Sequence, residues 1–239
     1  MDRNILGLYL NLQMLDREDV FWHFFHSLSR ERQQKLETMK AERSRRCSLG
    51  AWVLFDYGLR QLYGLREREV QIAYGAQGKP YVQDAPGICF NLSHSGDFAL
   101  AAFALFFTRV NSNAFASAAI GCDIQKTAEK KERVAARFFS EAEQRAVADG
   151  MDFYRIWARK ESYIKCTGDG MACDLRSFDV VTDWPSGVVS SMADRSADGA
   201  VCHFAEHFMP GYALALCYQY EETLPVIWQE VHPEQLMKL

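Results

Sequence analysis

Two apolar segments of nearly the same pattern recur far apart in this chain of 239 residues. Residues 96–103 read Gly-Asp-Phe-Ala-Leu-Ala-Ala-Phe, and residues 211–218 read Gly-Tyr-Ala-Leu-Ala-Leu-Cys-Tyr. Nearly continuous apolar runs of this length are typical of strands that are covered on both faces. An apolar helix is predicted before each segment, at residues 46–63 and 152–167. We therefore predict an α+β fold of two similar halves with a ligand cleft between them.

The Asn- and Ser-rich segment Val110–Ala116 is interpreted as a linker, which divides the chain into residues 1–113 and 114–239. Residues 90–97 are predicted to form a loop between strands. Further strands are predicted at residues 5–12, 71–74, 118–125, 178–181, 201–209 and 211–220, and further helices at residues 16–29, at residues 29–39 and after Ser140.

The composition excludes several function classes. The chain is 49% hydrophobic and 24% charged, as in an average globular protein with a sizeable core. A net charge of −4 gives no global basic field for nucleic acid. The longest apolar run, residues 98–107, is too short to span a membrane, and the N-terminus has no signal-peptide pattern. Seven cysteines without a C-x-x-C pair predict reduced thiols and a cytoplasmic location.

The predicted helix at residues 152–167 carries the main candidate site. Glu161 and Lys165 are four residues apart and lie on one side of the helix, while Lys160 borders its apolar stripe. Gly168 suits the end of the helix, where a positive φ is often needed. An exposed Glu–Lys pair on a core helix would explain the same spacing. The alternative is a carboxylate for metal binding or base catalysis beside two cations that bind phosphate.

Asp123 is predicted to lie at the end of an apolar strand, where an unpaired carboxylate is costly unless it caps, pairs or binds a metal. A capping or turn aspartate is the plainer interpretation. Together with Glu161 it could supply two oxygens to Mg²⁺, which binds one or two carboxylates, keeps waters and accepts substrate phosphates. Gln125 lies on the same face of the strand as Asp123, so its amide oxygen is a candidate third ligand or an orienting group.

Two loops carry candidate phosphate contacts. Lys79 is held between Gly78 and the rigid Pro80, which suits a positioned cation, although the spacing is not that of a P-loop. Ser93 and His94 provide a hydroxyl, an imidazole and backbone N–H groups for a phosphate. A solvated turn lysine and a polar hairpin end are the alternative interpretations of these two segments.

A zinc hydrolase is a competing function class, because His203, Glu206 and His207 spell H-x-x-E-H. That motif needs a helix to bring both histidines to one face. Residues 201–208 are instead predicted to form a strand, which disfavours a zinc site there.

Five blocks of the sequence together resemble the Sfp-type 4′-phosphopantetheinyl transferases. They occur in the order of that family and at comparable spacing, over about residues 40–170. The blocks are Gly78-Lys-Pro80, Phe90-Asn-Leu-Ser-His-Ser95, Ile120-Gly-Cys-Asp123, Phe138-Phe-Ser-Glu141 and Trp157-Ala-Arg-Lys-Glu-Ser-Tyr-Ile-Lys-Cys-Thr-Gly168. The resemblance implies the family's fold, with two halves related by a pseudo-twofold axis. It also favours the catalytic interpretation of residues 152–167.

The resemblance implies transfer of phosphopantetheine from coenzyme A to a serine of an acyl or peptidyl carrier protein, with release of adenosine 3′,5′-bisphosphate. It implies that Asp123 and Glu161 bind Mg²⁺ together with the pyrophosphate, and that Glu161 takes the serine proton. Lys165 would neutralise charge at the phosphate under attack, and Lys160 would help at the same pyrophosphate.

The family also implies residues for the adenine and 3′-phosphate end of coenzyme A. These are Lys79, Pro80, Ser93, His94, Lys40 and Arg46. Arg43 and Arg45 compete with Lys40 and Arg46 for the 3′-phosphate. The chain departs from many members at Gln125, where they carry a second acid, so Mg²⁺ is expected to bind with weaker affinity.

The family architecture, with both halves in one chain, implies a monomer. A non-catalytic module that binds coenzyme A and a carrier protein is the alternative, and the intact set of Asp123, Glu161 and Lys165 disfavours it. A basic stretch could contact an acidic carrier or form a solvated helix face. Its members are Lys126, Lys130, Lys131 and Arg133.

Overall fold

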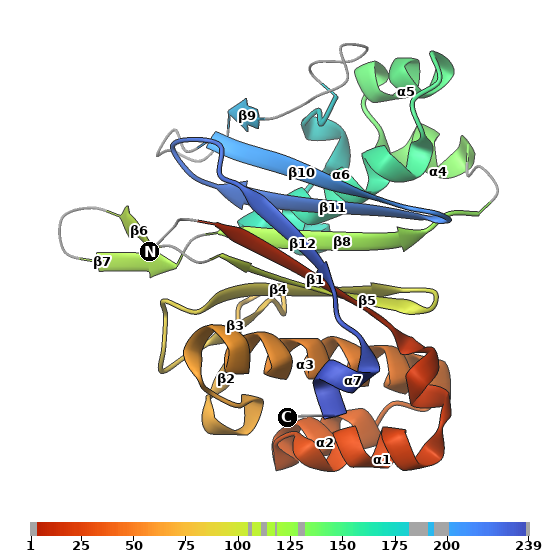
Figure 1. The fold of residues 1–239 in the computed structure, drawn as a ribbon. Helices are drawn as coiled ribbons and strands as arrows, with labels where there is room; N and C mark the ends of the chain where they lie inside the picture. Colours follow the sequence, from red (N-terminus) through yellow and green to blue (C-terminus); the bar gives the residue numbers. More distant parts are fainter. Residues whose placement is uncertain are drawn as a thin grey trace.

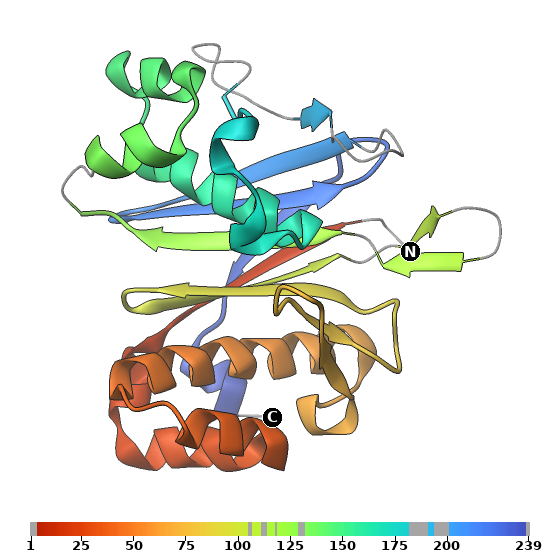
Figure 2. The same cartoon turned by 180° about the vertical axis from the view of Figure 1, so that it is seen from behind.

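Two four-stranded sheets pack face to face between two long helices, α3 (Glu42–Tyr63) and α6 (Phe153–Thr167) (Figures 1 and 2). The structure is a computed structural model. It describes residues 4–104, 107–110, 114–117, 119–128, 132–181, 191–193 and 201–237. The α+β fold of two halves predicted from the repeated apolar segments is present, with a helix covering one sheet in each half.

The first sheet has the strand order β12-β1-β5-β4. The strands are β1 (Ile5–Asn11), β4 (Cys89–Ser95), β5 (Phe98–Ala104) and β12 (Val226–Glu230). Strand β5 alternates between two apolar environments: Phe103 packs in the core shared with the helices, while Leu100 packs in the core between the sheets. The near-continuous apolar run therefore has the structure predicted for it, because both faces of β5 are covered.

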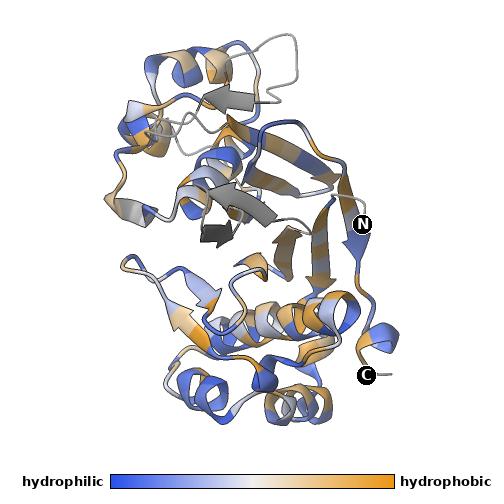
Figure 3. Ribbon diagram, turned by 90° about the vertical axis from the view of Figure 1, so that its left-hand side faces the viewer, coloured by the Kyte–Doolittle hydropathy of each residue, from blue (hydrophilic) through white to orange (hydrophobic). Residues whose placement is uncertain are grey.

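Helices cover the outer face of the first sheet, where they form the first core. They are α1 (Glu18–Ser27), α2 (Arg30–Glu37), α3 and the short α7 (Pro233–Met237). The strands β2 (Ile72–Tyr74) and β3 (Pro80–Val82) form a separate two-stranded ribbon. Short 3₁₀ helices lie at Leu12–Asp16, Glu67–Glu69, Gly170–Ala172 and Leu175–Ser177. Hydrophobic residues gather in the sheets and on α3 (Figure 3).

The second sheet has the strand order β8-β11-β10-β9. Its strands are β8 (Ile120–Lys126), β9 (Ser191–Ala193), β10 (Val201–Met209) and β11 (Tyr212–Gln219). The remaining helices of this half are α4 (Glu132–Phe138) and α5 (Glu141–Ala148). Helix α5 begins after Ser140, as predicted, and Ser140 and Glu143 form a capping box at its start.

Helix α6 lies directly on β8 because Gly121 has no side chain. A Cβ at Gly121 would collide with the carbonyl oxygen of Ser162 and the backbone of Cys166. Asp152 caps the helix N-terminus by accepting hydrogen bonds from the backbone N–H groups of Tyr154 and Arg155. Gly168 ends the helix with a φ of 84°, as predicted.

Side chains of β4 connect the two halves. Asn91, Ser93 and Ser95 alternate along this strand. The Asn91 Oδ1 accepts from the N–H of Cys122 at 2.9 Å, and the Ser95 Oγ accepts from the N–H of Lys126 at 3.0 Å. Ser93 accepts from the N–H of Ile124 at 3.4 Å. These contacts place β4 beside β8 and satisfy backbone donors of β8 without a continuous ladder.

Several sequence predictions are corrected. Residues 90–97 were predicted as a loop, but most of them belong to β4. The segment interpreted as a linker, residues 110–116, overlaps the end of β6 (Phe107–Val110) and most of β7 (Ala114–Ser117), which pair as antiparallel strands. Residues 178–181 are not a strand. Asp123 lies in the middle of β8 rather than at its end.

The C-terminus returns to the first half. Strand β12 pairs in parallel with β1, and Val231 and Leu236 pack in the first core. The division into residues 1–113 and 114–239 therefore does not follow the sheets and cores, because β12 belongs to the first sheet and residues 231–237 contribute to the first core.

No helix among the described residues is long and apolar enough to cross a membrane. None of the seven cysteines is in a disulfide, and six of them are buried, as expected of thiols in the core.

Candidate active site

A pocket of about 520 Å³ is lined by residues of both halves. The first half contributes residues of α2, α3, the β2–β3 region and β4, and the second half contributes residues of β8 and α6. Seven of the predicted site residues line it: Pro80, Ser93, His94, Asp123, Gln125, Glu161 and Lys165.

Asp123, Ser93 and Lys165 form the polar centre of the pocket. The Lys165 Nζ lies 2.7 Å from the Asp123 Oδ1, and the Ser93 hydroxyl donates to the same oxygen at 2.8 Å. Lys165 also donates to the Ser93 Oγ at 3.0 Å. Burial lowers the pKa of Lys165, but the charge and hydrogen bond of Asp123, together with the charges of Cys122 and Glu161, outweigh burial, so that the pKa is raised and the ammonium stays charged. The alternative interpretation of the sequence paired Lys165 with Glu161, whereas the structure pairs Lys165 with Asp123.

The second carboxylate oxygen of Asp123 is buried and has no hydrogen-bond partner among the described residues. Glu161 lines the same pocket, and its pKa is raised first by burial and then by the charge of Asp123. The charge of Asp123 disfavours ionisation of Glu161, and one oxygen of Asp123 is left unpaired, so this pair of carboxylates fits a divalent cation, which would compensate their charge.

The donor set suits Mg²⁺ better than a softer metal, since both acidic groups are hard oxygen donors. Gln125 lines the pocket on the face of β8 that carries Asp123. Among the described residues, no three His, Cys, Asp or Glu side chains are grouped to hold a metal. Asp123 and Glu161 would therefore need Gln125, water or substrate oxygens to complete the coordination.

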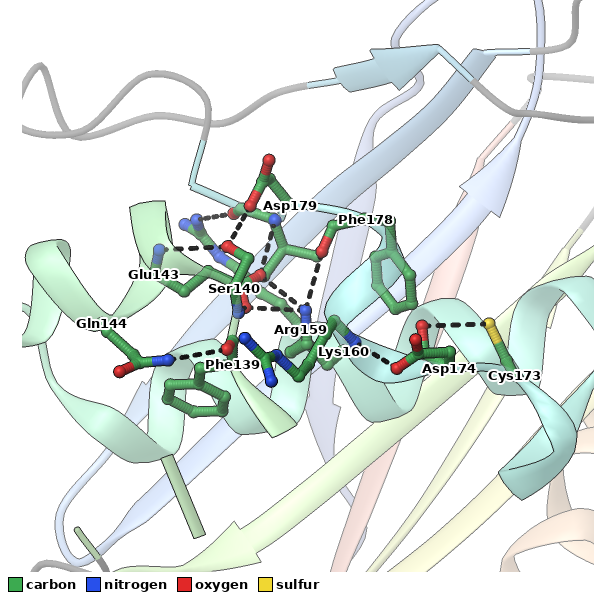
Figure 4. Close-up of polar contacts among 12 residues, drawn as sticks. Phe139, Ser140, Glu143, Gln144, Arg159, Lys160, Cys173, Asp174, Phe178 and Asp179 are labelled. Atoms are coloured by element: carbon green, nitrogen blue, oxygen red, sulfur yellow. Dashed lines mark hydrogen bonds and ion pairs between the residues drawn. The ribbon is translucent and has the colours of Figure 1, made fainter. Parts of the chain in front are cut away.

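Lys160 is not in the pocket. It is fully buried on the other side of α6, where its Nζ lies 2.7 Å from Glu143 and donates to the Phe178 carbonyl at 2.9 Å (Figure 4). This placement contradicts the expected contact of Lys160 with the pyrophosphate, because the Lys160 ammonium group is buried outside the pocket. Adjacent residues of a helix point in different directions, so Lys160 faces away from the pocket that Glu161 lines. The sequence alone does not reveal that the partner of Lys160 is Glu143 of α5.

Lys79 also does not line the pocket, although the neighbouring Pro80 does. Its Nζ donates to the carbonyl oxygens of Ile120, at 2.8 Å, and Cys166, at 3.0 Å. Burial lowers the pKa of Lys79. The side chain therefore binds backbone of the second half in place of the expected 3′-phosphate contact.

The other basic residues expected to contact the 3′-phosphate do not line the pocket either. Lys40 is exposed and does not line it. Arg46 forms an ion pair with Asp16. Arg43 and Arg45, their competitors, are also absent from the lining residues of the described pocket. Of the predicted basic stretch, Lys126 pairs with Asp97 at 2.8 Å, while Lys130 and Lys131 lie outside the described residues.

Arg32 is a pocket residue that the sequence did not single out. It is 6% exposed, its guanidinium carbon lies 3.3 Å from the centre of the Trp52 ring, and it donates to the Tyr74 hydroxyl at 2.9 Å. Its Nε is buried without a hydrogen-bond partner, and Glu67 lies 3.8 Å away. The available signal was its spacing of four residues from Leu36, which places both on the buried face of α2.

The histidines of the H-x-x-E-H motif do not form a metal site. Residues 201–209 form a strand, as predicted, so Glu206 points to the face opposite His203 and His207. Glu206 pairs with Arg155 at 2.8 Å and with Arg159 at 2.7 Å. His203 is hydrogen-bonded to the Tyr220 carbonyl. This arrangement removes the basis for a zinc hydrolase.

Two family models match the chain. The model described as the 4′-phosphopantetheinyl transferase superfamily matches residues 119–217. The model described as the N-terminal part of 4′-phosphopantetheinyl transferase matches residues 16–105. Together they cover both halves and the elements that line the pocket.

Curated relatives of the chain carry the same name. The 4′-phosphopantetheinyl transferase Sfp of Bacillus subtilis is 29% identical over 220 residues, which are 89% of this chain and 91% of the relative. The 4′-phosphopantetheinyl transferase gsp of Aneurinibacillus migulanus is 23% identical over 94% of this chain and 90% of its own. The 4′-phosphopantetheinyl transferase HetI of a Nostoc species is 33% identical over 55% of each chain.

Proposed function

Because the chain belongs to the 4′-phosphopantetheinyl transferase superfamily, we propose that its pocket binds coenzyme A for transfer of the phosphopantetheinyl group to a serine of a carrier protein. The observation that supports this most is the unpaired oxygen of Asp123 beside Glu161 and Lys165. Phosphoryl-type transfer requires positioning and charge neutralisation, and no covalent enzyme nucleophile is needed.

Asp123 and Glu161 would hold the Mg²⁺, with Gln125 as a further neutral donor. When bound, this ion would neutralise the pyrophosphate oxygens. Lys165 carries a positive charge in the same pocket, anchored by Asp123 at 2.7 Å. It would stabilise charge on the phosphate under attack, and Ser93 fixes the Asp123–Lys165 pair by bonding to both.

In the proposed reaction, the carrier serine hydroxyl attacks the phosphorus atom attached to the pantetheine. A new bond forms from the serine oxygen to this phosphorus, while its bond to the bridging oxygen of the pyrophosphate breaks. Adenosine 3′,5′-bisphosphate leaves with that oxygen. Glu161 takes the serine proton, directly or through a water.

We assign the nucleotide of coenzyme A to the part of the pocket formed by the first half. Arg32 is the buried cation there, held by Trp52 and Tyr74. A guanidinium that is oriented in this way suits a phosphate better than the exposed Lys40. His94 also lines the pocket, and its pKa is lowered first by burial and then by the Lys165 charge, so it is a neutral hydrogen-bonding group. Since one chain supplies both halves, we propose that it acts as a monomer.

The test is the intact mass of an apo carrier protein after incubation with the full chain, coenzyme A and Mg²⁺, with and without EDTA. A gain of one phosphopantetheinyl group that EDTA and Glu161→Gln abolish is the expected result. Glu141→Gln, which changes an exposed glutamate at the start of α5, is the matched control. Coenzyme A binding without any transfer to several carriers would indicate a non-catalytic module. Absence of coenzyme A binding would overturn the proposal.

A further inference from the structure

Lys79 belongs to the first half, but its ammonium binds the second. It follows the β2–β3 turn, between Gly78, whose φ is 80°, and Pro80. Its Nζ donates to the carbonyl oxygens of Ile120 and Cys166, 2.8 Å and 3.0 Å away. The Lys79 ammonium group is thus hydrogen-bonded to two backbone carbonyls. Burial lowers the pKa of Lys79.

The two acceptors belong to the elements that carry the catalytic pair. Cys166 is one of the last residues of α6, where carbonyl groups lack helical partners and the helix dipole favours a cation. Ile120 is the first residue of β8. Lys165 directly precedes Cys166, and Asp123 lies three residues after Ile120. Lys79 therefore joins β8, which carries Asp123, to α6, which carries Lys165; the side chains of these two residues are the pair 2.7 Å apart.

A second contact shows that the β2–β3 turn is seated against the end of α6. A Cβ at Gly170, just beyond the helix, would lie 3.3 Å from the Cβ of Gln77. A Cβ at Gly168 would lie 4.0 Å from the Cδ of Lys79. The turn that presents Pro80 to the pocket thus packs on the helix terminus that presents Lys165.

We propose that Lys79 is a positioning residue, which holds β8 and α6 in register and links the nucleotide side of the pocket to the Asp123–Lys165 pair. It does this without contacting a phosphate of coenzyme A. The inference rests on the proposed transferase function, and it differs from the role that the sequence resemblance implies for this lysine. A ligand contact and a positioning contact predict different effects of removing the ammonium group.

Lys79→Met in the full chain tests the two roles. We expect kcat to fall by at least about tenfold, because small displacements of catalytic groups are costly, and the Mg²⁺ concentration for half-maximal rate to rise. The preference for adenosine 3′,5′-bisphosphate over adenosine 5′-monophosphate, measured by calorimetry, should stay unchanged. Lys79→Arg, which retains a cation, should recover part of kcat. Arg32→Gln is the comparison variant, expected to lose that preference.

The outcomes separate the alternatives. Loss of the 3′-phosphate preference in Lys79→Met would make Lys79 a ligand contact and overturn the proposal. An unchanged kcat and Mg²⁺ requirement would overturn it as well. If Lys79→Met fails to fold, Lys79→Gln, which retains a hydrogen-bond donor, takes its place under the same criteria. If the wild-type chain modifies no carrier, the transferase proposal fails separately from this one. The role of Lys79 is then decided by two binding measurements on Lys79→Met: its nucleotide preference, and metal binding by Asp123 and Glu161.

Discussion

Gln125 presents a neutral amide on the strand face that carries Asp123. Because carboxylates bind Mg²⁺ more strongly than amides, Gln125→Glu should lower the Mg²⁺ concentration for half-maximal rate, on the order of tenfold. Titration of the rate with Mg²⁺ measures this, and Mn²⁺ binding checks it without turnover. Gln83→Glu adds the same charge at an exposed position outside the pocket and should change neither value. An unaltered metal dependence in Gln125→Glu would show that position 125 does not coordinate the metal.

Arg32 is the residue on which the nucleotide assignment depends. If its guanidinium binds the 3′-phosphate, Arg32→Gln should weaken binding of adenosine 3′,5′-bisphosphate by about ten- to a hundredfold, the value of a charge-assisted hydrogen bond. Binding of adenosine 5′-monophosphate should change much less. Arg30→Gln, on the exposed face of the same helix, is the matched control. An equal loss for both nucleotides would assign Arg32 to shaping the pocket and not to the 3′-phosphate.

At the residue scale, the sequence located the acidic centre better than the cations. Asp123 and Gln125 share a face because side chains alternate along a strand, and this rule holds without knowledge of the fold. The partners of Lys79 and Lys160 are a backbone carbonyl pair and a buried glutamate of another element. Contacts of this kind depend on tertiary packing, which local spacing does not determine.

At the scale of elements, two errors have tertiary causes. The polar segment at residues 90–97 forms β4 because Asn91, Ser93 and Ser95 meet the backbone of β8. The apolar segment at residues 178–181 does not form a strand, because side chains bind its backbone instead. Lys160 binds the Phe178 carbonyl, and Glu143 accepts from the Val180 N–H at 3.0 Å. The long helices and the covered strands were predicted correctly, since their hydrophobic patterns are sufficient.

The Glu143–Lys160 pair connects α5 to α6 in the core of the second half (Figure 4). Burial raises the pKa of Glu143 and lowers that of Lys160, so both charged forms are penalised by desolvation. Lys160→Met should therefore destabilise the fold by about 3–5 kcal/mol, because it leaves a buried charge unpaired. The double change Lys160→Met with Glu143→Gln should be closer to the wild type, since the amide oxygen can still accept from the Val180 N–H.

Urea unfolding of the single and double variants measures this coupling. The exposed pair Glu31–Lys35, also 2.7 Å apart, provides the comparison. Lys35→Met should cost under about 0.5 kcal/mol, as is usual for a solvated pair four residues apart on a helix. If the double variant at Glu143 and Lys160 is less stable than Lys160→Met, the unpaired charge of Glu143 is not what destabilises the single variant, which would contradict this prediction.

For the whole molecule, the two halves are not two consecutive parts of the chain, because the C-terminal strand β12 belongs to the sheet of the first half. Repeated apolar segments predicted two similar layers correctly, but no local pattern showed that residues 226–237 return to the first one. The strand β12 reads as an isolated apolar segment, and its place beside β1 depends on the parallel pairing of residues more than 200 positions apart. Its removal therefore tests whether the first half depends on the C-terminus.

A chain that ends at Glu222 should lose much of the stability of the first half. The deletion exposes the edge of β1, which is paired with β12, and removes Trp228, whose ring lies 2.6 Å from where a Cβ of Gly7 would be. Loss of Val231 and Leu236 from the core costs about 1.5–3 kcal/mol each. We expect a lower urea midpoint and self-association through the free strand edge, measured by circular dichroism and size-exclusion chromatography.

Ile227→Ala is the control for this deletion, because Ile227 lies in the same strand and is 49% exposed. It should leave the elution volume in size-exclusion chromatography and the urea midpoint nearly unchanged. The truncated chain should also lose nucleotide binding, since Arg32 and Trp52 belong to the half that the C-terminus covers. A truncated chain that unfolds at the wild-type midpoint and still binds adenosine 3′,5′-bisphosphate would show that the first half is stable without β12 and α7. The nucleotide side of the pocket, formed by α2, α3, the β2–β3 region and β4, would then not depend on the C-terminal segment.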